Sequence, residues 1–249
     1  MTTAIQTVDQ KALALANAVP TSGAPYIGAG DVLIPKILVI QKMSEKADDK
    51  NSEAEVGDLR DTANDEKFGD LETPMEFIPV AARTFWAEYE LDKKSGKKGD
   101  WIQNMDITPE NDKLPYKDGD IIRDRTHEIY VLLPEQIAAG VAFPYILSFR
   151  VSSLKGGQAV LTQMFVKNRD AGKPPWHAAM KLSLHEESND DGSFIVQRCK
   201  LSRAATDAEK IEAHRWAQII GAGGTRTDDS DLKQKTASTT AASVNSDKF

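Results

Sequence analysis

The chain has 249 residues, of which 40% are hydrophobic and 28% charged. This composition is typical of a soluble folded protein and excludes a chain that is disordered throughout. The single cysteine, Cys199, excludes an intrachain disulfide and a zinc site built on cysteine pairs. No long apolar run and no signal-peptide pattern occur in the sequence, so we expect a cytoplasmic protein without a membrane contact.

Charge is distributed unevenly along the chain, whose net charge is −7. Residues 44–72 carry eleven acidic and four basic side chains, whereas residues 142–220 carry eleven basic and eight acidic ones. The net charge argues against a nucleic-acid binder, but phosphates respond to the local field within about 8 to 10 Å. A polyanion-binding region and an ordinary domain with a solvated acidic loop are both compatible with this pattern.

The N-terminal half predicts a mobile arm followed by strands. Residues 1–30 are polar and broken by proline and glycine, which is typical of a flexible arm. Residues 32–40 form an apolar, β-branched run that predicts a buried strand. Residues 76–90 and 101–105 predict the two strands of a hairpin with a basic, glycine-containing tip. A long polar connection is expected over residues 106–125.

Further strands are predicted at residues 127–133, 145–153, 176–185 and 194–201, with a polar hairpin loop at residues 186–192. Residues 154–168 favour a helix over a strand. A capping box formed by Thr206 and Glu209 predicts a helix over residues 206–220, with Ala213, Trp216, Ala217 and Ile220 on its packed face.

These elements predict a mainly β domain over residues 31–221. Short strands with turns, one capped helix and no alternation of strands with long helices favour an OB-like, partly open antiparallel barrel with long insertions. Residues 222–249 have almost no large hydrophobic side chains to offset an ordering entropy of about 1 to 2 kcal/mol per residue, so they are expected to form a disordered tail.

Signatures of catalysis are missing from the sequence. It contains no phosphate-binding loop, no dinucleotide fingerprint and no Gly-x-Ser-x-Gly elbow, and its four histidines lack metal-ligand spacing. Asp118, Asp120 and Asp124 would form the magnesium site of a nuclease only if the fold clustered them. We therefore expect a binding protein that is not an enzyme and has neither a cofactor nor a metal.

Basic and aromatic residues alternate in two groups, and this pattern points to a groove for single-stranded nucleic acid. Lysines and arginines contact phosphates, while exposed rings stack on bases. The first group is Arg83, Trp86, Lys93, Lys94, Lys97, Lys98 and Trp101. The second group is Arg150, Lys155, Lys167, Arg169, Lys173, Trp176, Lys181, Arg198 and Lys200. Trp86 and Trp101 are equally compatible with core positions that face each other across the hairpin.

Strand alternation assigns faces to part of the second group. It places Arg150 with Ser148 and Ser152 on a solvated face, and Leu147, Phe149 and Val151 on the buried face. In the last strand it places Arg198 and Lys200 on one side with Phe194 and Val196.

Three segments carry a resemblance to a known family. They are Ile34-Pro-Lys-Ile-Leu-Val-Ile-Gln, Phe77-Ile-Pro-Val with Trp86 after it, and Phe143-Pro-Tyr-Ile-Leu-Ser-Phe-Arg-Val-Ser-Ser-Leu-Lys155. With them, residues 31–201 resemble the phage single-stranded DNA-binding proteins, OB-fold proteins of DNA replication and recombination. The resemblance implies DNA binding without sequence preference, no cofactor, and cooperative or dimeric coating of strands, with a homodimer as one assembly.

The same resemblance implies a C-terminal tail that recruits replication or recombination proteins. Asp228, Asp229, Asp231 and the terminal Phe249 fit such a tail. The family's tails are strongly acidic, however, whereas residues 225–249 carry four acidic and four basic side chains. Two other functions stay open: a strand-annealing recombination mediator, and a phage inhibitor that presents residues 44–72 to a host enzyme as a DNA mimic.

Overall fold

The computed structural model describes residues 33–42, 44, 53–190, 192–222 and 226–227. The expected N-terminal arm and most of the expected tail, including Asp228, Asp229, Asp231 and Phe249, lie outside these residues. None of the helices in the described ranges has the length and apolar character needed to cross a bilayer.

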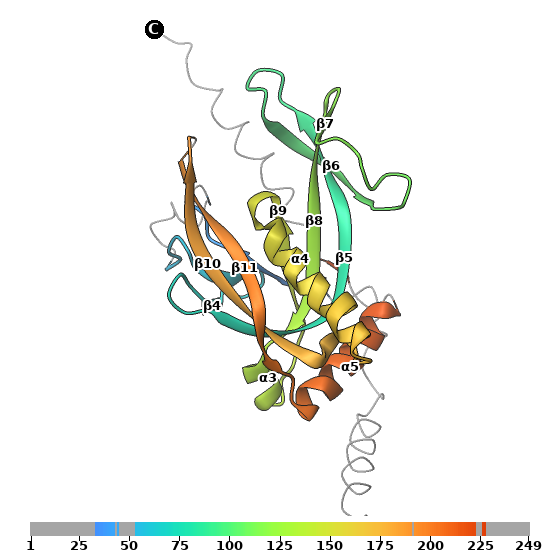
Figure 1. Cartoon of the computed structure of the whole chain (residues 1–249). Coiled ribbons are helices and arrows are strands. Elements are labelled where there is room, and N and C mark those ends of the chain that lie inside the picture. Colours follow the sequence, from blue (N-terminus) through green and yellow to red (C-terminus); the bar gives the residue numbers. More distant parts are fainter. Residues whose placement is uncertain (1–32, 43, 45–52, 191, 223–225, 228–249) are drawn as a thin grey trace, which may run out of the picture.

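Ten strands form one curled sheet that resembles half of a barrel (Figure 1). Its hydrogen-bonded path is β11-β10-β5-β8-β9-β2-β3-β4, with β6 added to β5 and β7 added to β8. The only parallel pair on this path is β2 with β9. The strands are Lys36–Val39 (β2), Leu59–Asp61 (β3), Lys67–Gly69 (β4), Met75–Leu91 (β5), Lys98–Asp106 (β6), Lys117–Asp118 (β7), Ile121–Leu132 (β8), Tyr145–Arg150 (β9), Ala178–Asn189 (β10) and Gly192–Ala204 (β11). The prediction of a mainly β, OB-like, partly open barrel is confirmed.

The remaining elements are short apart from two helices. A separate parallel pair joins β1 (Leu33–Ile34) to β12 (Arg226–Thr227), so two residues of the expected tail are in a strand. The helical elements are α3 (Pro134–Ala138), η2 (Val151–Ser153), α4 (Leu154–Thr162), the π-helical η3 (Gln163–Asn168), η4 (Pro175–His177) and α5 (Asp207–Gly221). Helix α5 begins with the predicted capping box of Thr206 and Glu209.

Strand β5 organises the sheet because it changes partners along its 17 residues. Its first residues, up to Phe77, pair with β10, and the rest pairs with β8. Pro79 cannot donate a ladder hydrogen bond, and the register with β8 shifts between Pro79 and Ala81, which is the usual place for a proline in a strand. From Phe85 onward β5 also pairs with β6. This part extends away from the half-barrel (Figure 1), and we call residues 85–125 the arm.

Apolar side chains fill both faces of the half-barrel. Ile129, Leu147 and Phe149 belong to a cluster that also includes Val160 and Met164 of the α4–η3 helix. The opposite face carries a second cluster, covered by α5 through Ala213 and Trp216. The helix α5 therefore buries the face predicted for it.

Two glycines allow α4 to approach the sheet closely. A Cβ atom at Gly156 would lie 2.6 Å from the backbone oxygen of Gln197, and one at Gly157 would lie 2.9 Å from Cβ of Phe149. Glycine inside a helix costs roughly 0.5–1 kcal/mol relative to alanine, so this contact must offset that cost. The helix begins at Leu154, ahead of both glycines.

The side chain of Gln41 forms hydrogen bonds with the backbone of β11, an edge strand of the half-barrel. Gln41, which follows β2, donates through Nε2 to the backbone oxygen of Ile195 and accepts from its backbone nitrogen through Oε1, both at 2.9 Å. Two residues further along β11, the backbone nitrogen of Gln197 donates to Oγ of Ser153 at 3.1 Å. Part of the β11 edge is thus satisfied by side chains rather than by another strand.

Several predicted boundaries are wrong. The expected polar connection at residues 106–125 contains β7 and the start of β8. The expected loop at residues 186–192 is much shorter, since β10 continues to Asn189 and β11 begins at Gly192. Trp176 lies in η4 rather than in a strand, because Pro174 and Pro175 precede it and strand pairing begins at Ala178.

The buried face predicted for Val151 is also wrong. Strand β9 ends at Arg150, so its alternation ends there, and Val151 begins a helical turn with 62% of its surface exposed. Its φ of 46° lies in the left-handed region, which a β-branched residue rarely adopts. Leu147 and Phe149 are buried as expected.

Candidate nucleic-acid interface

The two tryptophans of the first predicted group are packed into the arm. Trp86 on β5 exposes only 7% of its surface, and its Nε1 donates to the backbone oxygen of Asn111 at 3.0 Å. Trp101 on β6 is half-buried and donates to Oδ1 of Asn104 at 3.2 Å. They do not face each other, because Met105 is the residue opposite Trp86. Burial leaves little of either ring for a base to stack on.

Part of the arm's positive charge is neutralised by the arm's own carboxylates. Lys93 pairs with Asp120 at 2.9 Å, and Lys98 pairs with the buried carboxylate of Asp124. Lys93 and Asp120 lie in two turns of the arm, while Lys98 and Asp124 lie on β6 and β8, which both pair with β5. Four exposed arm lysines have no carboxylate at ion-pair distance among the described residues, namely Lys94, Lys97, Lys113 and Lys117.

A buried row of charges crosses four strands below the arm. Glu128 on β8 contacts Arg83 of β5 at 2.6 Å and Lys36 of β2 at 3.1 Å, and it accepts a hydrogen bond from Oγ of Ser148 on β9 at 3.1 Å. The side chains of Lys36 and Glu128 are 0% and 1% exposed. Buried charges require partners, so Arg83 is held by the fold.

Arg150 connects the two predicted groups. It donates to Oη of Tyr89 at 3.4 Å, and Nζ of Lys98 lies 4.4 Å from the centre of the same ring. Tyr89 is therefore the point at which the fold brings one cation from each group together.

The α4–η3 helix and the loop after it carry cations of a different kind. Lys155, Lys167 and Lys173 are exposed, and in the described part of the chain none of them has a carboxylate at ion-pair distance. Arg169 contacts only its neighbour Asp170, at 3.2 Å, and both side chains are largely exposed. Such a pair contributes about 0 to 1 kcal/mol, so Arg169 stays available to another anion. We call residues 151–173 the helical segment.

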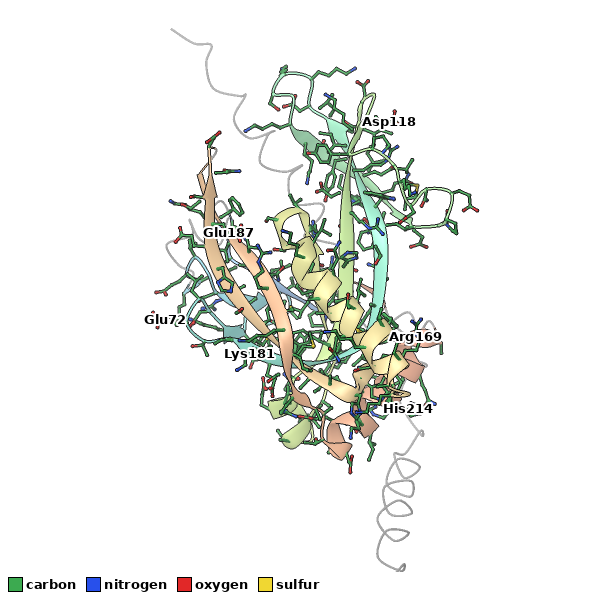
Figure 2. The ribbon with its side chains drawn as sticks, in the orientation of Figure 1. Glu72, Asp118, Arg169, Lys181, Glu187 and His214 are labelled. Atoms are coloured by element: carbon green, nitrogen blue, oxygen red, sulfur yellow. The ribbon has the colours of Figure 1, made fainter. Side chains whose placement is uncertain are left out.

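The last three predicted cations lie on the β10–β11 hairpin. Lys181 lies directly opposite Lys200 on β11 and opposite Glu76 on β5. Arg198 pairs with Glu187 at 2.6 Å. Figure 2 shows Lys181 and Arg169 well apart, with the α4–η3 helix between them. The cations of the hairpin therefore do not extend the group of cations on the helical segment.

Trp176, the third ring proposed for base stacking, is also half-buried. Its ring centre lies 5.5 Å from that of His214 on α5, and it packs against the cluster beneath that helix. Lys173 and Lys210 lie close enough to act on His177, whose pKa is lowered by burial and then by these two charges.

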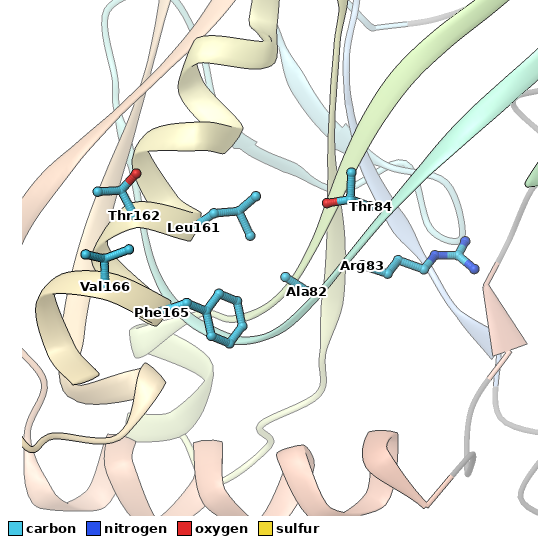
Figure 3. A pocket seen from close by; sticks show the side chains of 7 residues that line it. All are labelled: Ala82, Arg83, Thr84, Leu161, Thr162, Phe165 and Val166. Carbon is cyan, nitrogen blue, oxygen red and sulfur yellow. The ribbon is translucent and has the colours of Figure 1, made fainter. Parts of the chain in front are cut away.

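Phe165 is an exposed aromatic residue that the sequence did not single out. Among the described aromatic residues, the exposed ones are Phe165 at 43% and Tyr116 at 59%. Phe165 lies on η3 beside a cavity of about 390 Å³ between that helix and β5. Figure 3 shows the side chains of Phe165 and Leu161 directed toward Ala82, whereas Arg83 points away from the helix.

Behind this cavity lies a neutral histidine. Thr84 lines the cavity, and its Oγ1 is 2.9 Å from Nδ1 of His127 on β8. Burial, and then the nearby charge of Arg125, lower the pKa of His127 to about 4. In the described residues its Nε2 has no hydrogen-bond partner. The histidine behind the cavity is therefore uncharged near neutral pH, and the charged residue among those that line the cavity is Arg83.

The three aspartates considered for a magnesium site are bound by basic residues of the arm. Asp118 contacts Arg123 at 3.3 Å, while Asp120 and Asp124 pair with the arm lysines described above. Over the described ranges no group of three or more histidine, cysteine, aspartate or glutamate side chains is arranged to hold a metal ion.

In the acidic stretch, Asp58 is buried and bound by Arg60 at 3.0 Å and Lys67 at 2.8 Å. Burial acts to raise the pKa of Asp58, but hydrogen bonds, above all from Lys67, hold it below its ordinary value. Buried Asp61 accepts the backbone hydrogen bonds of Asn64 and Glu66. These carboxylates shape the β3–β4 hairpin, and residues 45–52 of the stretch lie outside the described residues.

Comparison with known proteins gives one match. The model of a phage protein family, described as Pam3 phage gp34-like protein, matches residues 7–218. Neither the curated proteins nor the solved structures yield a match. Because the family model covers most of the chain, including the half-barrel, the arm and the helical segment, this protein belongs to the Pam3 phage gp34-like family.

Proposed function

We propose that this protein binds single-stranded DNA without sequence preference, in phage DNA replication or recombination, and that the helical segment is its main contact surface. The observation that carries the proposal is the set of exposed cations there, Lys155, Lys167 and Lys173, which have no carboxylate partner among the described residues. Unpaired cations beside an exposed ring are the two components of a single-strand site.

Local charge supports the proposal despite the net charge of −7. Residues 151–177 contain four basic side chains and one acidic side chain, Asp170. A strand lying along this segment would be separated by more than a Debye length from much of the acidic surface, so screening would weaken the repulsion. The curled β-sheet is an architecture that hosts such sites in other proteins, which is an analogy of fold alone.

The proposal is tested by fluorescence anisotropy with a labelled oligo-dT, at several salt concentrations, with a duplex of equal length as the control. We expect tighter binding to the single strand, and affinity that falls steeply with salt as counterions are released. Anisotropy is preferable to tryptophan quenching, because the described tryptophans are buried or half-buried. Absence of binding at low salt would refute the proposal.

A variant locates the surface. In the triple variant Lys155→Ala, Lys167→Ala, Lys173→Ala, the slope of log K against log salt should decrease by about 2, since each contact to a single strand contributes about 0.7. The matched control replaces Lys113 and Lys117, which are exposed but lie among carboxylates of the arm, and should leave the slope unchanged. Equal slopes for the triple variant and wild type would place the contact surface elsewhere.

A further inference from the structure

Phe165 and its neighbour Val166 are large apolar residues at the surface of η3, each 43% exposed. Val160 and Met164 of the same helix are 0% and 1% exposed, whereas Phe165 is 43% exposed. An exposed aromatic ring beside a cavity loses hydrophobic stabilisation unless something covers it, and such surfaces commonly mark binding sites.

The cavity has the size and lining of a small-molecule site. Its volume of about 390 Å³ lies within the range of roughly 300–1,000 Å³ found for ligand pockets. Ala82 and Leu161 contribute apolar surface, and Thr84 and Thr162 contribute hydroxyl groups at its wall. A flat apolar ligand with polar edges fits this combination.

Hydrogen bonds between buried side chains tie the two ends of η3, the helix that carries Phe165. Nε2 of Gln163 donates to Oδ1 of Asn168 at 2.8 Å, and Nδ2 of Asn168 donates to the backbone oxygen of Pro175 at 2.7 Å. Gln163 and Asn168 are buried and mark the two ends of η3. Segments of π-helix are rare and occur frequently at functional sites.

Positive charge borders the ring. Arg169 follows Phe165 by four residues, so both lie on nearly the same side of the helix, and its only partner among the described residues is the exposed Asp170. Lys167 is exposed as well, but it is two residues from Phe165 and therefore lies on the other side of the helix. A ligand that combines a flat ring with a nearby negative charge therefore matches the site.

From these observations we infer that the cavity beside Phe165 receives one unpaired base of the bound strand, stacked on the Phe165 ring, while Arg169 contacts an adjoining phosphate. The inference rests on the proposed function and assigns its base-binding residue. A paired base is not accessible to such a pocket, so the site also explains how a single strand would be preferred over a duplex. An apolar protein side chain would fill the cavity too, but it would not require the cation.

The experiment compares oligo-dT with an oligomer of the same length in which abasic sites replace the bases, using wild type, Phe165→Ala, Phe165→Leu and Phe165→Tyr. Wild type should bind oligo-dT more tightly than the abasic oligomer. Phe165→Ala should lose affinity for oligo-dT by about 5- to 150-fold, the range for removal of one stacking ring, with an unchanged salt slope. Phe165→Tyr should keep the affinity, and Phe165→Leu should lose most of it.

Tyr116→Ala is the matched control, because Tyr116 is the other exposed aromatic residue of the described chain and lies on the arm. It should bind oligo-dT as wild type does. Phe165 is partly exposed, so the melting temperature should change little in its variants, and Phe165→Leu keeps the apolar bulk if Phe165→Ala folds poorly.

The outcomes separate this inference from the proposed function. If wild type binds no oligonucleotide, the proposed function fails and the inference fails with it. If wild type binds oligo-dT and the abasic oligomer equally, or if Phe165→Ala binds as wild type does, the strand is bound but no base occupies the cavity. If Phe165→Leu retains full affinity, the contact is apolar and not aromatic, which also overturns the inference. Photo-crosslinking of an iodouracil-containing oligomer should label the peptide that contains Phe165 and not the one that contains Tyr116.

Discussion

The arm has eight basic residues and the helical segment has four, and their charges are used differently. In the arm, Lys93 is bound to Asp120 and Lys98 is bound to Asp124. In the helical segment, Lys155 and Lys167 have no such partner among the described residues. Figure 2 shows how far apart the two regions lie, with Asp118 near the end of the arm and Arg169 near the end of the helix.

This difference follows from the geometry of the two elements. Adjacent antiparallel strands place side chains about 4.5–5.5 Å apart, so a strand with alternating charges meets its opposite charges on the neighbouring strand. Arg123 and Glu88, which lie opposite each other on β8 and β5, form such a pair at 2.7 Å. The helical segment has only one acidic residue, Asp170. A basic residue in the sequence therefore indicates a ligand site only when its neighbours in space are known.

The largest effect should come from removing a carboxylate that holds charges beneath the arm. Glu128→Ala should lower the free energy of unfolding by about 3–5 kcal/mol, because it leaves the buried ammonium of Lys36 without its carboxylate in the sheet. Denaturant unfolding measures this loss. Glu187→Ala, which removes an exposed partner of Arg198, is the control and should cost less than about 1 kcal/mol. Similar costs for the two variants would contradict the expected difference between buried and exposed ion pairs.

A pH-dependent loss of stability is expected from the titration of His127. His127 on β8 packs against Gly157 of α4, and its pKa falls from 6.5 to about 4 on folding. The unfolded chain therefore binds a proton between these pH values while the folded chain does not. Stability is fully present above pH 6.5 and should decrease by up to about 3 kcal/mol as the pH falls to 4, then level off for this group.

Urea unfolding at several pH values between 7 and 4.5 measures this slope. The comparison variant is His127→Gln, whose amide can keep a hydrogen bond to Thr84 but does not titrate. Carboxylates with lowered pKa, such as Asp58, act mainly at lower pH, since their ordinary values are near 4. A wild-type slope equal to that of His127→Gln would show that His127 is not the cause.

A smaller effect should distinguish the exposed lysines of the two regions. The double variant Lys155→Ala, Lys167→Ala should reduce the salt slope for oligo-dT by about 1.4, at 0.7 for each phosphate contact. The double variant Lys94→Ala, Lys97→Ala removes the unpaired lysines of the arm tip and should reduce it less. Both should leave stability nearly unchanged, because exposed substitutions of this kind cost little. A larger reduction for the arm variant would move the contact surface to the hairpin tip.

The smallest effect concerns the strained start of the helical segment. Val151→Gly should be neutral or should stabilise the protein by up to about 1 kcal/mol, because glycine accepts the φ of 46° without steric cost. Val166→Gly, at an exposed position inside η3, should destabilise it by up to about 1 kcal/mol. Opposite signs in thermal unfolding would confirm the strain, and two losses would refute it.

Much of the fold was predictable because its apolar pattern is regular. The strand at residues 76–90 and the capped helix at residues 206–220 follow from alternation and from the Thr206–Glu209 capping box. The beginning of β8 was missed because its buried side chains include charged ones, such as Arg123, which are satisfied only by a strand distant in sequence. The strand end at Arg150 was missed because Val151 has high β propensity in spite of its left-handed backbone.

The candidate site was predictable only in part. Lys155 and Lys167 were identified as basic residues, and the structure leaves them exposed. Trp86 and Trp101 were chosen as stacking residues because large rings are typical of such sites, but the same size makes them suitable for burial. Phe165 was missed, although the spacing of buried residues in a helix would have indicated that its side chain is exposed. Val160 and Met164, four residues apart, define the buried stripe, and Phe165 lies one residue outside it.

Gln41 has a consequence for the open edge of the half-barrel. The amide of Gln41 uses one N–H as a donor and its oxygen as an acceptor, as the backbone of a strand residue does, so Gln41 takes the place of a single residue of a strand that the half-barrel lacks. The unpaired edge of a sheet is a template on which a second molecule can add a strand, and this is a common route to aggregation. At Ile195 that template is already occupied from within the chain. An incomplete barrel can therefore keep one side open without becoming a seed for self-association at this position.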